Sequence, residues 1–331
     1  MGHSGQRLAD WCMIIAARVD TSGGGDRSGE YLKLKDRIGI IGGSGLEDLL
    51  RQADHSQAVE IETPFGRPAA PPVLCDWDGV PVAILARHGV GHLLNPTQVP
   101  YRANVYALKA VGCRWIIASG AVGSLNEAMK PRDLVLVDQT IDRTVRRTGT
   151  FFEDAAVHVE FAEPVCPVLR QIIMETAHRN LPSLKVHEGG TYLCMEGPAF
   201  STRAESMLYR TWGADLIGMT IMPEAKLARE AEISYASIAM VTDYDCWRPH
   251  QAGTAKLLLE EIISHLQAAT ANAMALIRAA LPQVWAKRHE EFAAHRALEL
   301  AIWSDRAKIS PPARDKLGLL WSRYFQHESS Q

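Results

Sequence analysis

The sequence predicts an α/β fold in which helices cover both faces of a mostly parallel or mixed sheet. The first observation is a series of short runs that are apolar on both faces, as strands are when helices cover them on both sides. The second is that segments with helical spacing of apolar residues separate these runs, so strand and helix patterns alternate along the chain.

The N-terminal residues 1–36 are expected to form a flexible extension. Residues 20–30 are dominated by glycine, serine and aspartate, a composition typical of a flexible linker. The apolar stretch Trp11–Ala17 follows Asp10 and ends at Arg18, which is a poor pattern for a secretory signal. We therefore expect a cytoplasmic protein.

The compact domain is expected to span residues 37–280 and to begin with a buried strand. Arg37–Ile41 has the apolar strand pattern, and Gly42–Gly45 ends it before the helical segment Leu46–Leu50. A glycine loop at the start of a helix can curl its N–H groups around an anion. The same pattern also fits a tight turn that binds nothing.

Six further runs continue the strand series, and four helical segments lie among them. The predicted strands are Val80–Ala86, Trp115–Ala118, Leu134–Val137, Tyr192–Met195, Leu216–Met219 and Ile238–Thr242. The predicted helices are Tyr101–Val111, Pro167–Arg179, Thr202–Trp212 and Pro223–Glu232.

An Ala/Leu-rich helix is predicted over residues 253–280, at the end of the domain. Residues 281–331 are expected to be a helical C-terminal extension, charged and continuing as helix to about Arg306. Ser310–Pro312 should break this helix, and a last short helix should cover Asp315–Phe325.

Polar residues follow several predicted strands, where open α/β sheets bind ligands. Arg87 and His88 follow Val80–Ala86; an arginine fork beside a histidine suits phosphate, and a plain surface pair is the alternative. Residues 119–124 are predicted to form a small-residue loop of the anion-binding type. Thr220 precedes a helix, where its hydroxyl either caps the helix or reaches an anion.

Asp243 and Asp245 follow the last predicted strand. Residues two apart on a strand face the same side, so both carboxylates are expected to point into one site. Two like charges so close raise the pKa of at least one of them, which suits proton transfer. The alternative is that one carboxylate caps a turn and the other pairs with an arginine.

Composition narrows the classes of ligand. The formal net charge is −3, so no global positive field attracts nucleic acid or an anionic membrane. The six cysteines are scattered without a C-x-x-C pair, and neither a zinc motif nor a P-loop occurs. We therefore expect a small-molecule ligand, with no metal and no organic cofactor.

Several motifs together carry a resemblance. The chain contains, in order, Ile40–Leu46, Ala86–Gly89, Gly197–Glu205, Gly213–Asp215 and Thr242–Trp247, with Asn104–Lys109 and Ala162–Pro164 among them. These segments resemble the trimeric purine nucleoside phosphorylase family, and within it the phosphorylases of S-methyl-5′-thioadenosine. The resemblance covers roughly residues 37–280.

The resemblance implies one α/β domain around a mixed, partly barrel-like sheet, assembled as a homotrimer or a dimer of trimers. It implies a phosphate site made of Ser44, Arg87, His88, the backbone near Ala121, and Thr220. Met219 would lie under the ribose, and Phe200 and Ser201 would contact the base. His158 would reach the nucleoside bound by a neighbouring subunit.

The implied reaction is phosphorolysis of a purine nucleoside, with inorganic phosphate as co-substrate. Phosphate stabilises a ribosyl cation, and Asp243 protonates the leaving base at N7 while Asp245 tunes it. One carboxylate can accept hydrogen bonds from a protonated N7 and a 6-amino group, so Asp243 favours adenine nucleosides over 6-oxo purines.

Three features depart from the family pattern. Gly120 stands where relatives often carry a hydroxyl or amide near phosphate, and residues 248–254 do not align with the apolar residues that complete the 5′ pocket. The tail beyond about Leu281 exceeds the usual family length, and we expect it to pack on a trimer surface or a neighbour. The alternatives are a related phosphorylase of methylthioinosine, inosine or another 5′-modified nucleoside, a nucleoside hydrolase, and a non-catalytic nucleoside-binding or regulatory protein.

Overall fold

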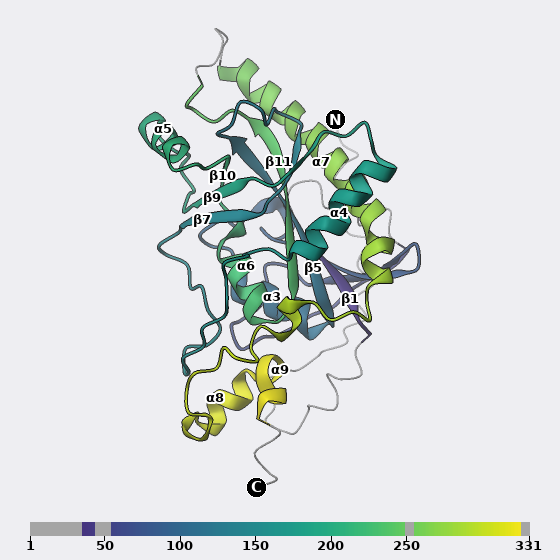
Figure 1. Cartoon of the computed structure of the whole chain (residues 1–331), viewed down its shortest axis with the longest axis vertical. Helices are drawn as coiled ribbons and strands as arrows, with labels where there is room; N and C mark the ends of the chain where they lie inside the picture. The colour runs from purple at the N-terminus through teal and green to yellow at the C-terminus, as the bar shows by residue number, and fades with distance from the viewer. Residues whose placement is uncertain (1–34, 44–53, 249–254, 326–331) are drawn as a thin grey trace, which may run out of the picture.

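The computed structural model describes residues 35–43, 54–248 and 255–325. Within them, one mixed sheet of eleven strands runs through the molecule, and helices cover both of its faces (Figure 1). The predicted single α/β domain with a mixed central sheet is confirmed. The helix predicted over Leu46–Leu50 lies outside the described residues, as do Ser44 and Gly45.

The strands lie side by side in the order β2–β3–β4–β1–β5–β10–β9–β7, and a branch of β11, β6 and β8 leaves from β5. Their bounds are β1 Arg37–Gly42, β2 Asp54–Ala58, β3 Val73–Trp77, β4 Val80–Ala86, β5 Cys113–Ser124, β6 Leu134–Leu136, β7 Gln139–Arg143, β8 Val186–Glu188, β9 Thr191–Met195, β10 Leu216–Gly218 and β11 Ser234–Asp243. Strands β1, β4, β5 and β11 are parallel, whereas β3 is antiparallel to β4 and β10 to β5.

Strand β5 is the centre of this arrangement. One edge of β5 pairs with β1 as far as Ala118 and with β10 from Gly123, and the other edge pairs with β11. The prediction of a loop over residues 119–124 is therefore wrong, since these residues continue β5. Strand β11 gives this segment a hydrogen-bonding partner, which its small side chains alone do not reveal.

The sheet curls on itself. Two residues separate β6 from β7 and two separate β8 from β9, yet β6 and β7 lie on opposite branches of the sheet. Leu136 pairs with Glu188 and Gln139 pairs with Thr191, so a parallel ladder continues in the same register across the gap. Two branches joined in this way close the sheet like part of a barrel.

Two layers of helices bury the sheet. On one face α3 (Tyr101–Ala110) packs with α6 (Ile221–Glu230), and on the other α4 (Pro167–Asn180) packs with α7 (Ala255–Ala286). Ile38 and Ile40 of β1 belong to the core under α4 and α7, and Ile41 belongs to the core under α3 and α6. This is why the strand runs are apolar on both faces.

Two further helices lie in the described part of the domain: the short η1 (Val90–His92), and α5 (Arg203–Thr211), which lies at the edge of the sheet (Figure 1). Its Tyr209 packs against Leu193 of β9 and Ile217 of β10. No helix in the described ranges is long and apolar enough to span a bilayer.

Beyond the domain, α7 continues to Ala286, and the helix predicted to reach about Arg306 is wrong. Residues 287–325 contain short pieces instead: η2 Ala293–Arg296, η3 Arg306–Lys308, α8 Pro311–Lys316, α9 Gly318–Trp321 and η4 Ser322–Tyr324. Pro311 and Pro312 begin α8 rather than ending a helix, because proline is well tolerated in the first helical turn.

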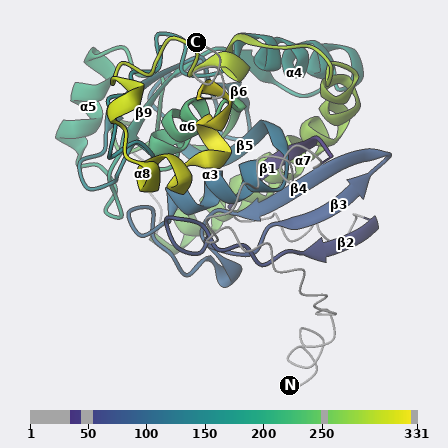
Figure 2. The same cartoon turned by 90° about the horizontal axis from the view of Figure 1, so that it is seen from below.

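The described tail packs against its own chain. Leu298, Ile309, Leu317 and Trp321 belong to the same core cluster as α3 and α6, and Figure 2 shows the yellow tail lying over these helices. We expected the tail to pack on a trimer surface or a neighbour, and the structure makes it part of the fold of a single chain.

Candidate active site

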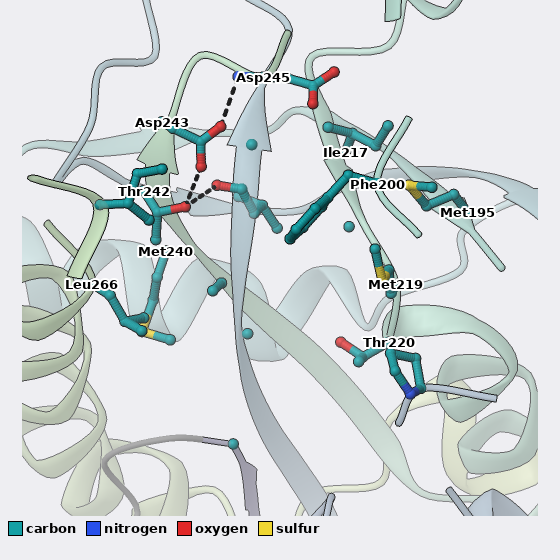
Figure 3. A pocket seen from close by; sticks show the side chains of 18 of the residues that line it. Met195, Phe200, Ile217, Met219, Thr220, Met240, Thr242, Asp243, Asp245 and Leu266 are labelled. Atoms are coloured by element: carbon teal, nitrogen blue, oxygen red, sulfur yellow. Dashed lines mark hydrogen bonds between the residues drawn. The ribbon is translucent and has the colours of Figure 1, made fainter. Parts of the chain in front are cut away.

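A cavity of about 500 Å³ opens where the ends of several strands meet (Figure 3). It is lined by Gly43 after β1, Arg87 and His88 after β4, Thr220 after β10, and Asp243 at the end of β11. The strand-end groups that the sequence presents separately therefore share one space, as expected for an α/β sheet. Within the described ranges, His, Cys, Asp and Glu side chains do not gather in groups of three or more as metal ligands do.

Arg87 is buried, and one side of its guanidinium is paired with the carboxylate of Glu224. Its Nε lies 2.8 Å from Glu224 Oε2 and its Nη2 lies 2.9 Å from Glu224 Oε1. The fork that the sequence assigned to phosphate therefore faces Glu224, which also accepts from the Tyr235 hydroxyl at 2.9 Å. Burial disfavours the charge on Arg87, but the Glu224 carboxylate outweighs it and holds the pKa of Arg87 above its usual value.

Part of the Arg87 guanidinium still borders the cavity. Its Nη1 donates to the Ser119 carbonyl at 2.9 Å, so two of the five N–H bonds lack a partner among the described residues. A Cβ atom at Gly120 would lie 4.0 Å from this Nη1 and 3.3 Å from Thr220 Oγ1. Position 120 therefore adjoins both groups, and its lack of a side chain leaves space between them.

His88 presents an acceptor to the cavity. Its Nδ1–H donates to the Leu94 carbonyl at 2.8 Å, and its ring stacks on His92 with ring centroids 4.2 Å apart. Because a carbonyl only accepts, Nδ1 carries the proton and Nε2 of the neutral ring is an acceptor. Burial, and then the charge of Arg87, lower the pKa of His88 to about 4, so the ring is neutral at pH 7.

Thr220 stands at the N-cap position of α6 without a side-chain cap bond, which removes the alternative that its hydroxyl serves the helix. The hydroxyl borders the cavity instead, near Gly120. Ala121 also lines the cavity. Ser44 lies outside the described residues, and its neighbour Gly43 lines the cavity.

Asp243 lies at the opposite end of the cavity from Thr220 (Figure 3). Its Oδ2 accepts from the Thr242 hydroxyl and its Oδ1 from the backbone N–H of Asp245, both at 2.7 Å. Each carboxylate oxygen keeps a lone pair for a further donor. Asp243 can therefore accept two hydrogen bonds from a ligand without losing its protein partners.

Asp245 lines the same cavity in a different way from the prediction. Strand β11 ends at Asp243, so the two-residue period does not apply, and Asp245 lies in a turn with a φ of 47°. Its carboxylate accepts from the hydroxyls of Ser201, at 3.0 Å, and Ser206. The carboxylates of Asp243 and Asp245 do not point toward each other, and the contact of Asp245 with Asp243 is through its backbone (Figure 3).

Apolar side chains line the cavity between the end at Thr220 and the end at Asp243. Met219 points into the cavity between Thr220 and Phe200 (Figure 3). Phe200 is 85% exposed and lines the same cavity. A flat, apolar ligand can therefore lie against Phe200.

A second apolar wall was missed by the sequence analysis. It consists of Met240 on β11 with Ile262 and Leu266 on α7. The spacing of four between Ile262 and Leu266 places both on one helix face, and this signal is readable in the sequence. Only the fold shows that this face of α7 meets the cavity.

His158 does not line this cavity. It is exposed, its backbone N–H donates to the Ala301 carbonyl at 2.9 Å, and its ring packs against Trp303 with centroids 4.8 Å apart. The structure therefore does not bring His158 to the site of its own chain.

Comparison with protein families gives one clear match. The model of the Phosphorylase superfamily matches residues 37–282. S-methyl-5′-thioadenosine phosphorylase of Thermosynechococcus vestitus is 49% identical over 293 residues, covering 87% of this chain and 99% of the relative. The enzyme of the same name from Prochlorococcus marinus is 44% identical over 303 residues, with 91% and 95% covered. These alignments are longer than the family match, so the likeness continues outside residues 37–282.

Solved structures agree. A methylthioadenosine phosphorylase from an antarctic soil metagenomic library superimposes with a TM-score of 0.80 at 46% identity, covering 87% of this chain and 99% of that one. Methylthioadenosine phosphorylase from Schistosoma mansoni in complex with tubercidin gives a TM-score of 0.71 at 35% identity, with 80% and 97% covered.

Proposed function

Because this chain belongs to the phosphorylase superfamily, we propose that it cleaves S-methyl-5′-thioadenosine with inorganic phosphate, giving adenine and 5-methylthioribose 1-phosphate. The enzyme is then a pentosyltransferase of purine and methionine salvage. The observation that carries the proposal is the single cavity with Arg87, His88 and Thr220 at one end and Asp243 at the other.

The two ends match the two halves of the reaction. Phosphate next to Thr220 and Arg87, completed by Ser44 and the backbone near Ala121, lies below the sugar. It stabilises the positive charge that develops as the C1′–N9 bond stretches, and it then captures C1′. At the other end Asp243 supports protonation of the leaving base at N7. The proton count balances, because HPO₄²⁻ gives up one proton and adenine gains one.

The hydrogen-bonding capacity of Asp243 also supports adenine, rather than a 6-oxo purine, as the base of the substrate. Its two oxygens can accept from the 6-amino group and a protonated N7, while Ser201, held by Asp245, orients the base loop. A 6-oxo purine brings an acceptor to the same place and leaves buried polar atoms unpaired. Inosine and methylthioinosine are therefore the poorer substrates.

The apolar wall formed by Met240, Ile262 and Leu266 supports a methylthio group as the 5′ substituent of the substrate. Met240, Ile262 and Leu266 offer no hydrogen bond, so they suit a methylthio group better than a hydroxyl. We propose that His158 of a neighbouring subunit completes this region in a homotrimer or a dimer of trimers. A solution mass of three or six chains supports that assembly, and a monomer with full activity contradicts it.

The remaining proposals concern cofactor and compartment. We propose that phosphate is the only co-substrate, that no metal or organic cofactor takes part, and that activity survives treatment with a chelator. We also propose a cytoplasmic location, supported by the free cysteines Cys75, Cys113, Cys166, Cys194 and Cys246.

Initial rates on four nucleosides test the function. With phosphate, methylthioadenosine should be cleaved faster than adenosine, inosine and methylthioinosine. Without phosphate, turnover should stop, whereas a nucleoside hydrolase would continue. If both inosine compounds are faster, the role given to Asp243 is wrong.

The Asp243→Asn variant sharpens this test. It should lose about 100-fold or more of its turnover on methylthioadenosine, and its relative preference should move toward 6-oxo purines. Asp305→Asn, on the exposed tail, should behave like the wild-type protein. Unchanged turnover in Asp243→Asn would favour a non-catalytic or differently catalysed site.

A further inference from the structure

Arg147 is a buried arginine next to the cavity that lines none of it. Its side chain is 2% exposed, and its guanidinium contacts two different loops and, at 3.1 Å from Nη1, the Tyr101 hydroxyl of α3. Nothing in the sequence motifs singles it out. Its contacts are therefore those of a residue that holds other parts of the protein in place, and not those of a ligand-binding group.

One side of Arg147 holds the loop that carries Phe200 and Ser201. Its Nε lies 3.1 Å from Glu196 Oε1, and Nη2 donates to the backbone carbonyl of Glu196. Glu196 directly precedes Gly197, where the base-contacting loop begins. The position of this loop therefore depends on the Arg147–Glu196 pair.

The other side of Arg147 holds the loop that carries Met219 and Thr220. Its Nη1 lies 2.6 Å from the carbonyl oxygens of both Met219 and Met222, at the start of α6. Met222 departs from helical geometry inside α6, with a ψ of 135°, so this turn does not hold itself by regular helix bonds. Arg147 supplies the donor for it.

Glu196 is fixed in turn by its surroundings. Its carboxylate accepts from the backbone N–H of Val145 at 2.7 Å, from that of Arg146 at 3.0 Å, and from the Thr97 hydroxyl at 2.7 Å. Although burial opposes ionisation, these hydrogen bonds lower the pKa of Glu196 to about 2. Arg147 is thus anchored on a carboxylate that stays charged at any pH of interest.

We propose that Arg147 is a positioning residue that holds the base-binding loop at a fixed distance from the loop of Met219 and Thr220. This rests on the proposed function, in which the base leaves C1′ on one side as phosphate approaches from the other. A misplacement of about 1 Å between such groups costs on the order of 100-fold in rate. Loss of Arg147 therefore reduces turnover more than it weakens binding of either substrate.

The test compares Arg147→Met, Arg147→Lys and Arg323→Met. Arg323 is the control. Its side chain is 49% exposed, it also joins a buried glutamate, Glu232, and the His295 carbonyl, and it does not line the cavity. Arg147→Met should lose about 100-fold in kcat with the KM of each substrate changed less than about threefold. Arg147→Lys, which keeps a charge against Glu196 and reaches fewer acceptors, should fall between. Arg323→Met should lower the melting temperature and leave kcat unchanged.

Hydrogen exchange gives a readout that needs no substrate. In Arg147→Met, the segments 196–201 and 219–222 should lose protection together, and in Arg323→Met neither should change. Unchanged kcat in Arg147→Met, or exchange that rises in only one segment, would overturn the positioning role. Absence of phosphate-dependent cleavage by the wild-type protein would refute the proposed function instead, and the exchange result would still decide whether Arg147 couples the loops.

Discussion

At the scale of single residues, we propose that His88 selects among the anions that bind in the cavity. Its Nδ1–H is held by the Leu94 carbonyl, and burial lowers its pKa to about 4, so Nε2 is an acceptor at neutral pH. Phosphate keeps an O–H donor at neutral pH, whereas sulfate has none. The neutral ring therefore favours phosphate over sulfate.

We expect sulfate to compete with phosphate only when His88 takes up a proton. A bound dianion raises the pKa of His88 above its free value, so proton uptake accompanies sulfate binding at pH values between the two. Sulfate affinity should then fall as the pH rises, by up to about tenfold for each pH unit, from about pH 4 to the pKa of His88 in the sulfate complex. Inhibition constants for sulfate against phosphate across this range check the slope.

Two variants test whether His88, rather than a neighbouring group, takes up the proton when sulfate binds. The charged or titratable groups that face its ring are Arg87, Arg147 and His92. His88→Asn offers an amide donor at every pH, so its sulfate inhibition should not depend on pH. His92→Asn should keep the wild-type slope. Equal slopes in the wild-type protein and His88→Asn would show that another group binds the proton.

The sequence predicted those cavity residues whose place in the site follows from their position at the end of a strand. Arg87, His88, Thr220 and Asp243 all directly follow or end strands, and strand ends meet at one edge of a sheet. The partner of Arg87 was not predictable, because Glu224 is distant in the sequence and nothing local marks the pair. Long-range pairs between charged side chains depend on the packed fold.

At the scale of elements, the end of α6 contains a buried acid. Glu230 accepts from the Thr150 hydroxyl and the Phe151 N–H, both at 2.7 Å, and links α6 to that loop. Burial raises the pKa of Glu230 to about 7, although these two hydrogen bonds oppose the shift. The folded state therefore holds a proton that the unfolded state releases near its ordinary pKa of about 4.5.

Stability should decrease as the pH rises through this interval. Between about pH 4.5 and 7 the folded state binds more protons than the unfolded state, so the free energy of unfolding falls with pH and then levels off. Glu230→Gln stays neutral and should remove this decline, gaining about 3 kcal/mol at pH 8 relative to the wild-type protein. Urea unfolding at several pH values measures it. Glu290→Gln, on an exposed side chain, is the control, and a wild-type pH profile in Glu230→Gln would contradict the assignment.

Element boundaries were predictable where apolar patterns are long. The strand over Val80–Ala86 and the helix starting at Pro167 agree with β4 and α4, because burial on both faces imposes a continuous apolar run. Strand β2 was not found, since Asp54–Ala58 is polar and lies at the edge of the sheet. The second half of β5 was missed because small residues are typical of both loops and closely packed strands.

At the scale of the whole molecule, the C-terminal tail is part of the fold. The sequence showed a charged tail after the domain, whereas its apolar residues insert beside α3 and α6. The buried apolar side chains of the tail lie on or beside short helical pieces, so they do not produce a long periodic signal. The resemblance implied a partly barrel-like sheet and the strand over Leu134–Val137 was predicted, whereas β8, which completes the closure, was not predicted because it has only three residues.

Trp321 provides the test of this integration. It is 1% exposed, its ring lies 4.9 Å from that of Phe152, and its Nε1 donates to the Arg314 carbonyl at 3.0 Å. Trp321→Ala should therefore lower the free energy of unfolding by about 3–5 kcal/mol. Lys308→Ala, on the same tail but with a side chain 85% exposed, should change it by less than about 0.5 kcal/mol.

Measuring kcat as well as stability shows whether the tail serves the fold alone or also catalysis. No described residue after Ala286 lines the cavity, so Trp321→Ala should keep the wild-type kcat at temperatures where it remains folded. Denaturant unfolding and initial rates on the same samples measure both quantities. Equal stability of Trp321→Ala and Lys308→Ala would show that the tail packs without contributing to the core. A loss of kcat in fully folded Trp321→Ala would mean instead that the tail, through α3 and α6, sets the geometry of Thr220, because α6 begins immediately after it.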